Sequence, residues 1–207
     1  DLYQMHWPPS DGTSLEEYWG TLLELKKEGK VRAVGLSNHR VAQLEAAERI
    51  GHVDTLQPPF SAIRREIAAA ELPWCEAHET GVIVYSPMQS GLLTGAFSKE
   101  RARKLPKDDW RSRAPDFTGE RLERNLQLAE ALKPIAGRHE TSVAAVAIAW
   151  TLAWPGVTGA IVGARSPSQV DDWMDAATLE LTNQDLADIA RAIDSTGAGN
   201  GPAMPKR

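Results

Sequence analysis

Cysteine and long apolar runs are both scarce in this chain. Its 207 residues include a single cysteine, Cys75, which excludes an intrachain disulfide and a cysteine-based metal cluster. The setting of Cys75 in Leu72-Pro73-Trp74-Cys75 is typical of core packing. No apolar run approaches the roughly 20 residues of a membrane span, and the N-terminus lacks a signal-peptide pattern. We therefore expect no membrane partner and a cytoplasmic location.

An excess of positive charge is also missing. Lys and Arg total 23 against 28 Asp and Glu, which gives a net charge of −5 at pH 7. Such a chain is not expected to bind nucleic acid, and any attraction to phosphate must be local. Four of the five histidines, His39, His52, His78 and His139, show no metal-ligand spacing, so we expect no metal site.

Short β-rich runs alternate with helical patterns along the chain. Leu15, Trp19 and Leu22, for example, recur at three- and four-residue steps, and Gly29 ends that pattern. The alternation predicts an α/β fold with a parallel sheet. The predicted strands are residues 2–6, 31–36, 53–57, 82–85 and 160–162. Further helices are predicted at 41–50, 66–78, 121–136, 142–152, 168–176 and 183–193.

The position of the glycines favours a barrel over a doubly wound sheet. The Gly-x-Gly cluster, residues 197–201, lies at the end of the chain and not between a strand and a helix, as a dinucleotide fingerprint must. A (β/α)8 TIM barrel needs about 250 residues. We therefore expect a partial barrel, with about five parallel strands, surrounding helices and a C-terminal helix. Residues 1–207 then form a single domain that lacks the N-terminal three βα units, and residues 195–207 are expected to be a flexible tail.

The connection at residues 86–117 is unlike the others. It is far longer than the about 2 to 6 residues that are usual for a βα loop. It carries many basic side chains in an acidic protein: Lys99, Arg101, Arg103, Lys104, Lys107, Arg111 and Arg113. This composition is typical of a solvated loop and equally of a lid that holds phosphate.

Polar side chains stand where the predicted strands end, which is where barrels place their function. An imidazole, amides, hydroxyls, an aromatic ring and an arginine together suit a ligand with a planar ring and a phosphate. Taken singly, Ser37 and Asn38 are also typical of a helix cap, Gln57 of a loop hydrogen bond and Tyr85 of packing. The strand-end residues are His6, Ser37, Asn38, Gln57, Tyr85, Ser86 and 163–166.

Four ordered motifs across the chain resemble the aldo-keto reductase family. The similarity covers the C-terminal five-eighths of its barrel and is nearest the bacterial and plant-type reductases allied to potassium-channel β subunits. The motifs are Asp1-Leu2-Tyr3-Gln4-Met5-His6-Trp7-Pro8, Gly29-Lys30-Val31-Arg32-Ala33-Val34-Gly35-Leu36-Ser37-Asn38, Val84-Tyr85-Ser86-Pro87 with Gly91-Leu92-Leu93-Thr94-Gly95, and Ile161-Val162-Gly163-Ala164-Arg165-Ser166-Pro167-Ser168-Gln169.

The resemblance implies an NADP site. Ser37, Asn38 and Gln57 match residues that bind the nicotinamide carboxamide, and Tyr85 matches the aromatic ring on which the nicotinamide stacks. The pyrophosphate loop is matched by Ser86, Met88, Gly91 and Leu92, which makes residues 86–117 a cofactor lid. The adenosine-phosphate site is matched by Gly163, Arg165 and Gln169, where an arginine before a helix favours a 2′-phosphate. Trp173 departs from the family, which commonly has an asparagine near the adenine at this position; an indole could stack on the adenine instead.

The resemblance also implies the chemistry. His6 matches the histidine of the catalytic tetrad, but the aspartate, tyrosine and lysine of that tetrad lie on earlier strands that this chain does not contain. Tyr3, Tyr18 and Tyr85 are not placed to replace the proton donor. We expect NADPH-dependent reduction of aldehydes or ketones, with little or no activity in these 207 residues alone. The alternative is a non-catalytic module that binds cofactor or a protein partner. Open sheet edges predict self-association.

Overall fold

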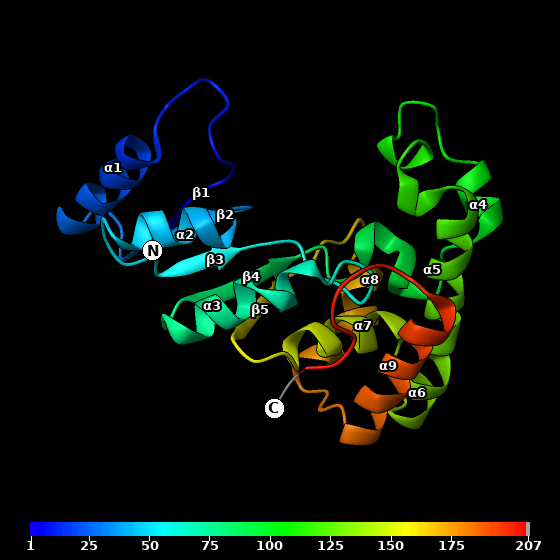
Figure 1. Cartoon of the computed structure of the whole chain (residues 1–207). Helices are drawn as coiled ribbons and strands as arrows, with labels where there is room; N and C mark the ends of the chain where they lie inside the picture. The colour runs from blue at the N-terminus through cyan, green and yellow to red at the C-terminus, as the bar shows by residue number, and fades with distance from the viewer. Residues whose placement is uncertain (206–207) are drawn as a thin grey trace.

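A five-stranded parallel sheet in sequential order, β1-β2-β3-β4-β5, forms the centre of the molecule (Figure 1). The structure is a computed structural model that describes residues 1–205. Within these residues the sheet does not close, and β1 and β5 are its two edges. The expected α/β fold with about five parallel strands is thus confirmed. The strands are β1 (Leu2–Met5), β2 (Ala33–Ser37), β3 (Thr55–Gln57), β4 (Gly81–Tyr85) and β5 (Val157–Ile161).

Helices flank the sheet, with α1 and α2 near β1 and β2, and α5, α6 and α9 at the other end of the molecule (Figure 1). The α-helices are α1 (Leu15–Lys27), α2 (Val41–Glu48), α3 (Glu71–Ala77), α4 (Lys99–Arg103), α5 (Gly119–Ala131), α6 (Lys133–Arg138), α7 (Val143–Leu152), α8 (Pro167–Met174) and α9 (Asn183–Thr196). The short 3-10 helices are η1 (Glu66–Ala69), η2 (Gln89–Thr94), η3 (Trp110–Ser112), η4 (Pro115–Phe117) and η5 (Asp175–Ala177).

Two predicted helices are each split in the structure, and a proline explains both breaks. Residues 66–78 form η1 and then α3, with Pro73 in the first turn of α3. Residues 121–136 are divided between α5 and α6, with Pro134 in the first turn of α6. Proline lacks an N–H, so it is tolerated in a first turn but interrupts a longer helix.

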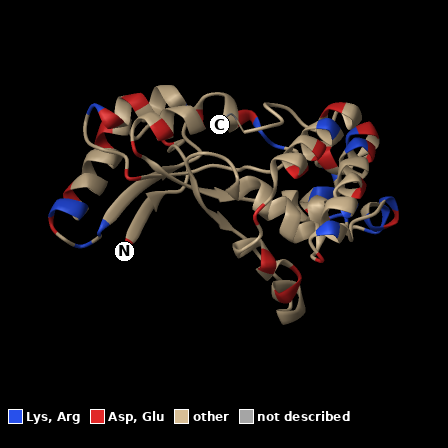
Figure 2. Ribbon diagram, turned by 90° about the horizontal axis from the view of Figure 1, so that it is seen from below, with Lys and Arg blue, Asp and Glu red and all other residues tan. Residues whose placement is uncertain are grey.

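The segment 86–117 folds into η2, α4, η3 and η4 and is not an extended loop. Several of its basic side chains are paired: Lys99 with Glu123, Lys104 with Glu100, and Arg111 with Asp109. Figure 2 accordingly shows Lys and Arg interleaved with Asp and Glu at this end of the molecule. The role of this segment as a cofactor lid stays a prediction.

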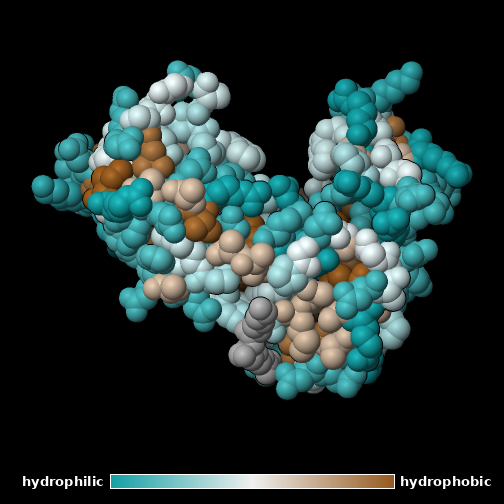
Figure 3. Space-filling model, viewed as in Figure 1, coloured by the Kyte–Doolittle hydropathy of each residue, from teal (hydrophilic) through white to brown (hydrophobic). Residues whose placement is uncertain are grey.

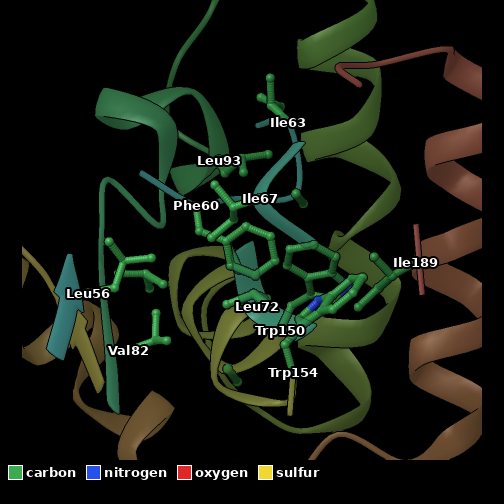
Figure 4. Packing of buried hydrophobic residues seen from close by; sticks show 14 of the residues in the cluster. Leu56, Phe60, Ile63, Ile67, Leu72, Val82, Leu93, Trp150, Trp154 and Ile189 are labelled. Carbon is green, nitrogen blue, oxygen red and sulfur yellow. The ribbon is translucent and has the colours of Figure 1, made fainter. Parts of the chain in front are cut away.

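The core extends from α1 and α2 past the sheet to α5, α7 and α9. The helix α7 is buried almost all round, since residues 143–151 are all buried. Figure 4 shows Phe60 beside Trp150 and Trp154, with ring centroids 5.3 and 5.4 Å from that of Phe60, and Ile189 of α9 on the far side. A helix that is apolar on every face is stable only when neighbours cover it in this way.

The chain after α9 packs against the segment that follows β3. The Arg65 side chain donates to the carbonyls of Ala198 (3.0 Å) and Gly201 (3.2 Å), and the Arg65 N–H donates to the carbonyl of Asn200. Ala198 is buried. Residues 195–207 were expected to be a flexible tail; the described part of that segment is packed, its mobility in solution stays a prediction, and residues 206–207 lie outside the described residues.

The β1 end of the molecule exposes apolar side chains. Leu2 and Tyr3 of β1 are 37% and 52% exposed, and Trp7, just after the strand, is 55% exposed. Figure 3 shows apolar surface toward this end. Self-association through the open edge stays a prediction. None of the helices within residues 1–205 has both the length and the apolar character to cross a bilayer.

Candidate active site

Asn38 joins the carboxyl ends of β1, β2 and β4. Its backbone is left-handed (φ 64°), a conformation that asparagine tolerates better than most residues. Its Nδ2 donates to the carbonyl of His6 (2.9 Å), and its Oδ1 accepts from the Tyr85 hydroxyl (2.7 Å). Three residues that the sequence singled out from separate strands are therefore held in one hydrogen-bonded group.

Ser37 and Gln57 belong to the same group. The Ser37 hydroxyl donates to the Gln57 carbonyl (2.7 Å), and Asn38 Nδ2 donates to the Ser37 Oγ (3.0 Å). Ser37 is 1% exposed, so its hydroxyl is buried where it links the ends of β2 and β3. The contacts of Ser37, Asn38 and Gln57 with a nicotinamide carboxamide stay predictions.

Gln4 and Thr55, which no motif in the sequence marked, extend this group across the sheet. Gln57 Nε2 donates to Gln4 Oε1 (2.7 Å), and Gln4 Nε2 donates to Thr55 Oγ1 (2.9 Å). Alternation along β1 is the signal that could have found Gln4, because it lies two residues before His6 and so shares its face. Tyr3 then points to the opposite face.

Gly35 makes room for the contact between Gln4 and Thr55. In the sheet register, Gly35 on β2 lies between Gln4 on β1 and Thr55 on β3. A Cβ atom at Gly35 would lie 2.0 Å from Thr55 Oγ1 and 3.1 Å from Gln4 Cγ. A glycine inside a strand often marks a close approach of this kind.

The three tyrosine hydroxyls are either engaged or turned away from His6. The Tyr18 hydroxyl lies 2.8 Å from His39 Nε2, and that of Tyr85 donates to Asn38. Burial raises the pKa of both phenols, so neither is a stronger acid than free tyrosine. The exposed imidazole of His6 lies beside Trp7, with ring centroids 5.7 Å apart.

A cleft of about 1020 Å³ begins at Tyr85 and runs between η2, the segment 108–111 and the end of β5. Figure 3 shows the surface hollowed between the projection that carries α4 and the opposite end of the molecule. The volume is at the top of the range of about 300 to 1,000 Å³ for cofactor sites. Most of the predicted cofactor residues line it: Tyr85, Ser86, Met88, Gly91, Gly163, Arg165 and Gln169. Leu92 is instead fully buried in the core.

The wall of the cleft at η2 has an unusual backbone. Ser86, Gln89, Ser90 and Gly91 all have positive φ, and a Cβ atom at Gly91 would meet nothing within 4 Å. The Gln89 side chain fixes this conformation, because its Nε2 donates to Asp116 (2.8 Å) and its Oε1 accepts from Ser61 (3.0 Å). Left-handed turns of this kind let the backbone approach a ligand closely, and the ligand is commonly a phosphate.

The far end of the cleft is locally basic. Arg165 lines both the cleft and an adjoining pocket of about 450 Å³, and Arg101 and Arg111 line the two as well. The hydrogen bonds from Arg111 lower the pKa of Asp109 to about 2, and the charge of Arg165 contributes to the same shift. Arg165 therefore lies near η3 of the predicted lid. Its own backbone is fixed by the Gln169 side chain, which accepts from the Arg165 N–H (2.7 Å).

Trp173 forms part of the cleft wall at α8. It packs on a small apolar cluster of Ala145, Ile148 and Ala176, and its indole Nε1 is buried without a hydrogen-bond partner among residues 1–205. Contacts of this indole with adenine stay a prediction. The residues that the structure describes contain no group of His, Cys, Asp and Glu that could hold a metal ion.

Comparisons with known proteins place the chain in one family. The aldo/keto reductase family profile matches residues 1–194. The chain is 32% identical over 197 residues to aldo-keto reductase YhdN of Bacillus subtilis (strain 168), covering 95% of this chain and 59% of that protein. It is 29% identical over 205 residues to the NADH-specific methylglyoxal reductase of Escherichia coli (strain K12), covering 94% and 60%.

A solved structure shows the same arrangement of the whole chain. The glycerol dehydrogenase AKR11B4 from Gluconobacter oxydans superposes with a TM-score of 0.88 at 31% identity, covering 100% of this chain and 62% of that one. The chain thus spans about three fifths of the length of the relatives it matches. On the extent of the family match, this chain belongs to the aldo/keto reductase family.

Proposed function

We propose that this chain binds NADP(H) and acts in the reduction of aldehydes or ketones. The observation that carries the proposal is the continuity of the site. Tyr85, which is hydrogen-bonded to Asn38 and through it to the His6 carbonyl, also lines a cleft that extends to Arg165. A planar ring at one end, a phosphate-binding backbone in the middle and a cation at the other end suit a phosphorylated dinucleotide.

Residues of the cleft and of the neighbouring strand ends would each hold a different part of such a cofactor. Tyr85 would support the nicotinamide ring, while Asn38 and Gln57 would bind its carboxamide. The left-handed backbone at Ser86 and Gly91 would approach the pyrophosphate. When bound, NADPH supplies the hydride for carbonyl reduction. His6, on the same face as Gln4, would orient the carbonyl oxygen of a small-molecule substrate.

The preference for NADP rests on Arg165. The structure gives its guanidinium no ion pair within residues 1–205, although Arg101 and Arg111 line the same pocket. A relative of the chain is named as NADH-specific, so the preference needs its own test. NADPH should bind more tightly than NADH in a fluorescence titration, and Arg165→Ala should remove about 1 to 3 kcal/mol of that preference.

Arg113→Ala is the matched control, because Arg113 is an arginine of the neighbouring segment 86–117 that lines neither pocket. It should leave the preference unchanged. Equal affinities of the unaltered chain for NADPH and NADH would refute the NADP assignment, as would equal losses in the two variants.

Turnover needs a proton as well as a hydride. A positioned acid contributes about 10²–10⁴-fold to such a step, and none of the tyrosines here is placed beside His6. We therefore expect cofactor binding with little or no turnover by the 207-residue chain. An NADPH-oxidation assay on a panel of aldehydes and ketones, with His6→Ala as control, tests this. Binding without turnover also fits a non-catalytic cofactor-binding module; robust His6-dependent turnover would refute that alternative.

A further inference from the structure

A buried histidine contacts the Ser37–Asn38 turn, and a buried tyrosine contacts that histidine. His39, which follows the turn, is 2% exposed, and Tyr18 of α1 is 7% exposed. His39 Nδ1 lies 2.8 Å from the carbonyl oxygen of Ser37, and the Tyr18 hydroxyl lies 2.8 Å from His39 Nε2. These contacts form a chain from helix α1 to the end of strand β2.

The chemistry of the contacts assigns the protons. A carbonyl oxygen can only accept, so His39 Nδ1 carries the hydrogen and donates it to Ser37. His39 Nε2 is then an acceptor, and the Tyr18 hydroxyl donates to it. Burial lowers the pKa of His39, which keeps the ring neutral and so preserves this arrangement.

The Ser37 carbonyl belongs to the peptide bond that joins Ser37 to Asn38, and the Asn38 backbone is left-handed. Several hydrogen bonds hold this turn, and two of them, from the Ser37 hydroxyl (2.7 Å) and the Asn38 N–H (3.1 Å), go to the Gln57 carbonyl. The Asn38 side chain bonds to the Tyr85 hydroxyl and to the His6 carbonyl. Among the described side chains, only His39 bonds to the carbonyl oxygen of Ser37, and Tyr18 in turn bonds to His39.

We propose that Tyr18 and His39 are positioning residues for the nicotinamide end of the site, holding the turn so that the Asn38 amide faces the cofactor carboxamide. The inference rests on the proposed function, because the orientation of Asn38 matters to a ligand only if a nicotinamide is bound beside it. Neither residue touches the cleft: both lie outside its lining.

The test compares two ligands. NADPH carries a nicotinamide, whereas 2′,5′-ADP has the adenosine and the 2′-phosphate but no nicotinamide. His39→Phe leaves the Ser37 carbonyl without its buried donor and should weaken NADPH about ten-fold. It should change the affinity for 2′,5′-ADP by less than about two-fold, because that ligand occupies the Arg165 end of the cleft. His52→Phe, at an exposed histidine, is the matched control and should affect neither ligand.

Three further variants separate positioning from folding. Tyr18→Phe removes one oxygen atom and should cause a smaller loss of NADPH affinity in the same direction. The same change in a His39→Phe background should add nothing, because the two residues act through one contact. His39→Asn should retain part of the affinity, since its amide can donate to Ser37 as Nδ1 does.

The outcomes are distinguishable. Selective loss of NADPH affinity in Tyr18→Phe and His39→Phe supports the inference. Equal losses for both ligands, or no loss in either variant, would overturn it while leaving the proposed function in place. An unaltered chain that binds neither ligand would overturn both.

Discussion

Asp185→Asn should lower the free energy of unfolding more than any other single charge removal on α9. The Asp185 carboxylate, whose side chain is 2% exposed, joins α9 to the end of α6. Its Oδ1 accepts from Arg138 Nη2 (2.6 Å), and its Oδ2 lies 2.9 Å from His139 Nε2. The same Oδ2 accepts from the backbone N–H (3.0 Å) and the hydroxyl (2.6 Å) of Thr182, the N-cap of α9.

The magnitude follows from these partners. An asparagine retains one acceptor and turns an amide N–H₂ toward groups that are themselves donors. Removing one member of a fully buried ion pair costs about 3 to 5 kcal/mol. Arg138 is 46% exposed, so solvent screens its share, and we expect about 2 to 3 kcal/mol for Asp185→Asn.

The pH dependence gives the prediction a second readout. Burial alone would raise the pKa of Asp185, but the hydrogen bonds from Thr182, Arg138 and His139 outweigh it and hold the pKa well below its ordinary value. A carboxyl whose pKa is lower in the folded state stabilises the protein above its unfolded pKa of about 3.9, and that stability is lost as the pH falls below it. The difference in free energy of unfolding between wild type and Asp185→Asn should therefore become smaller at acid pH.

Urea unfolding followed by tryptophan fluorescence at pH 7 and pH 3 measures both effects. Asp188→Asn is the matched control, because Asp188 lies one turn further along α9 and also pairs with Arg138, but is 25% exposed. It should cost less than about 1 kcal/mol. Equal losses of stability in the two variants at pH 7 would contradict this prediction. So would a larger difference in stability between wild type and Asp185→Asn at pH 3 than at pH 7.

Two further predictions concern the sheet and the core. Gly35→Ala should destabilise the protein by about 1 to 3 kcal/mol, the usual cost of overpacking, because the new Cβ would lie 2.0 Å from Thr55 Oγ1. Gly20→Ala, where the space is open, should not do so in the same thermal melts, and equal melting temperatures would contradict the packing of Gln4 against Thr55. Burial raises the pKa of the Cys75 thiol to about 12, so Cys75 should react with Ellman's reagent at pH 8 only after denaturation, and fast reaction of the native chain would show that the thiol is accessible.

The fold was largely predictable from the sequence because its signals are local. All five predicted strands exist, and α9 begins at residue 183 as predicted, after an N-cap in which Thr182 and Asp185 bond to each other. The helix breaks at Pro73 and Pro134 were missed because the apolar periodicity continues across them. The short helices of residues 86–117 were missed for the opposite reason, since helices of three to six residues are too short for periodicity to show.

The site residues at the strand ends were predictable from the sequence, but the residues that hold them in place were not. His6, Asn38 and Tyr85 come together as their positions indicated. The contacts of Gln4 with Thr55, and of Tyr18 with His39, join residues 51 and 21 positions apart, and no local pattern marks such pairs. The Leu92 side chain lies in the core, and the match of this residue to the pyrophosphate loop stays a prediction.

The most direct test of the account is isothermal titration calorimetry of the mass-verified 207-residue chain with NADPH. The continuous cleft from Tyr85 to Arg165 predicts saturable binding of one NADPH per chain, with an affinity that weakens as salt is added because Arg165 holds a phosphate. Absence of saturable heat at millimolar NADPH, with the chain shown to be folded by circular dichroism, would contradict the account.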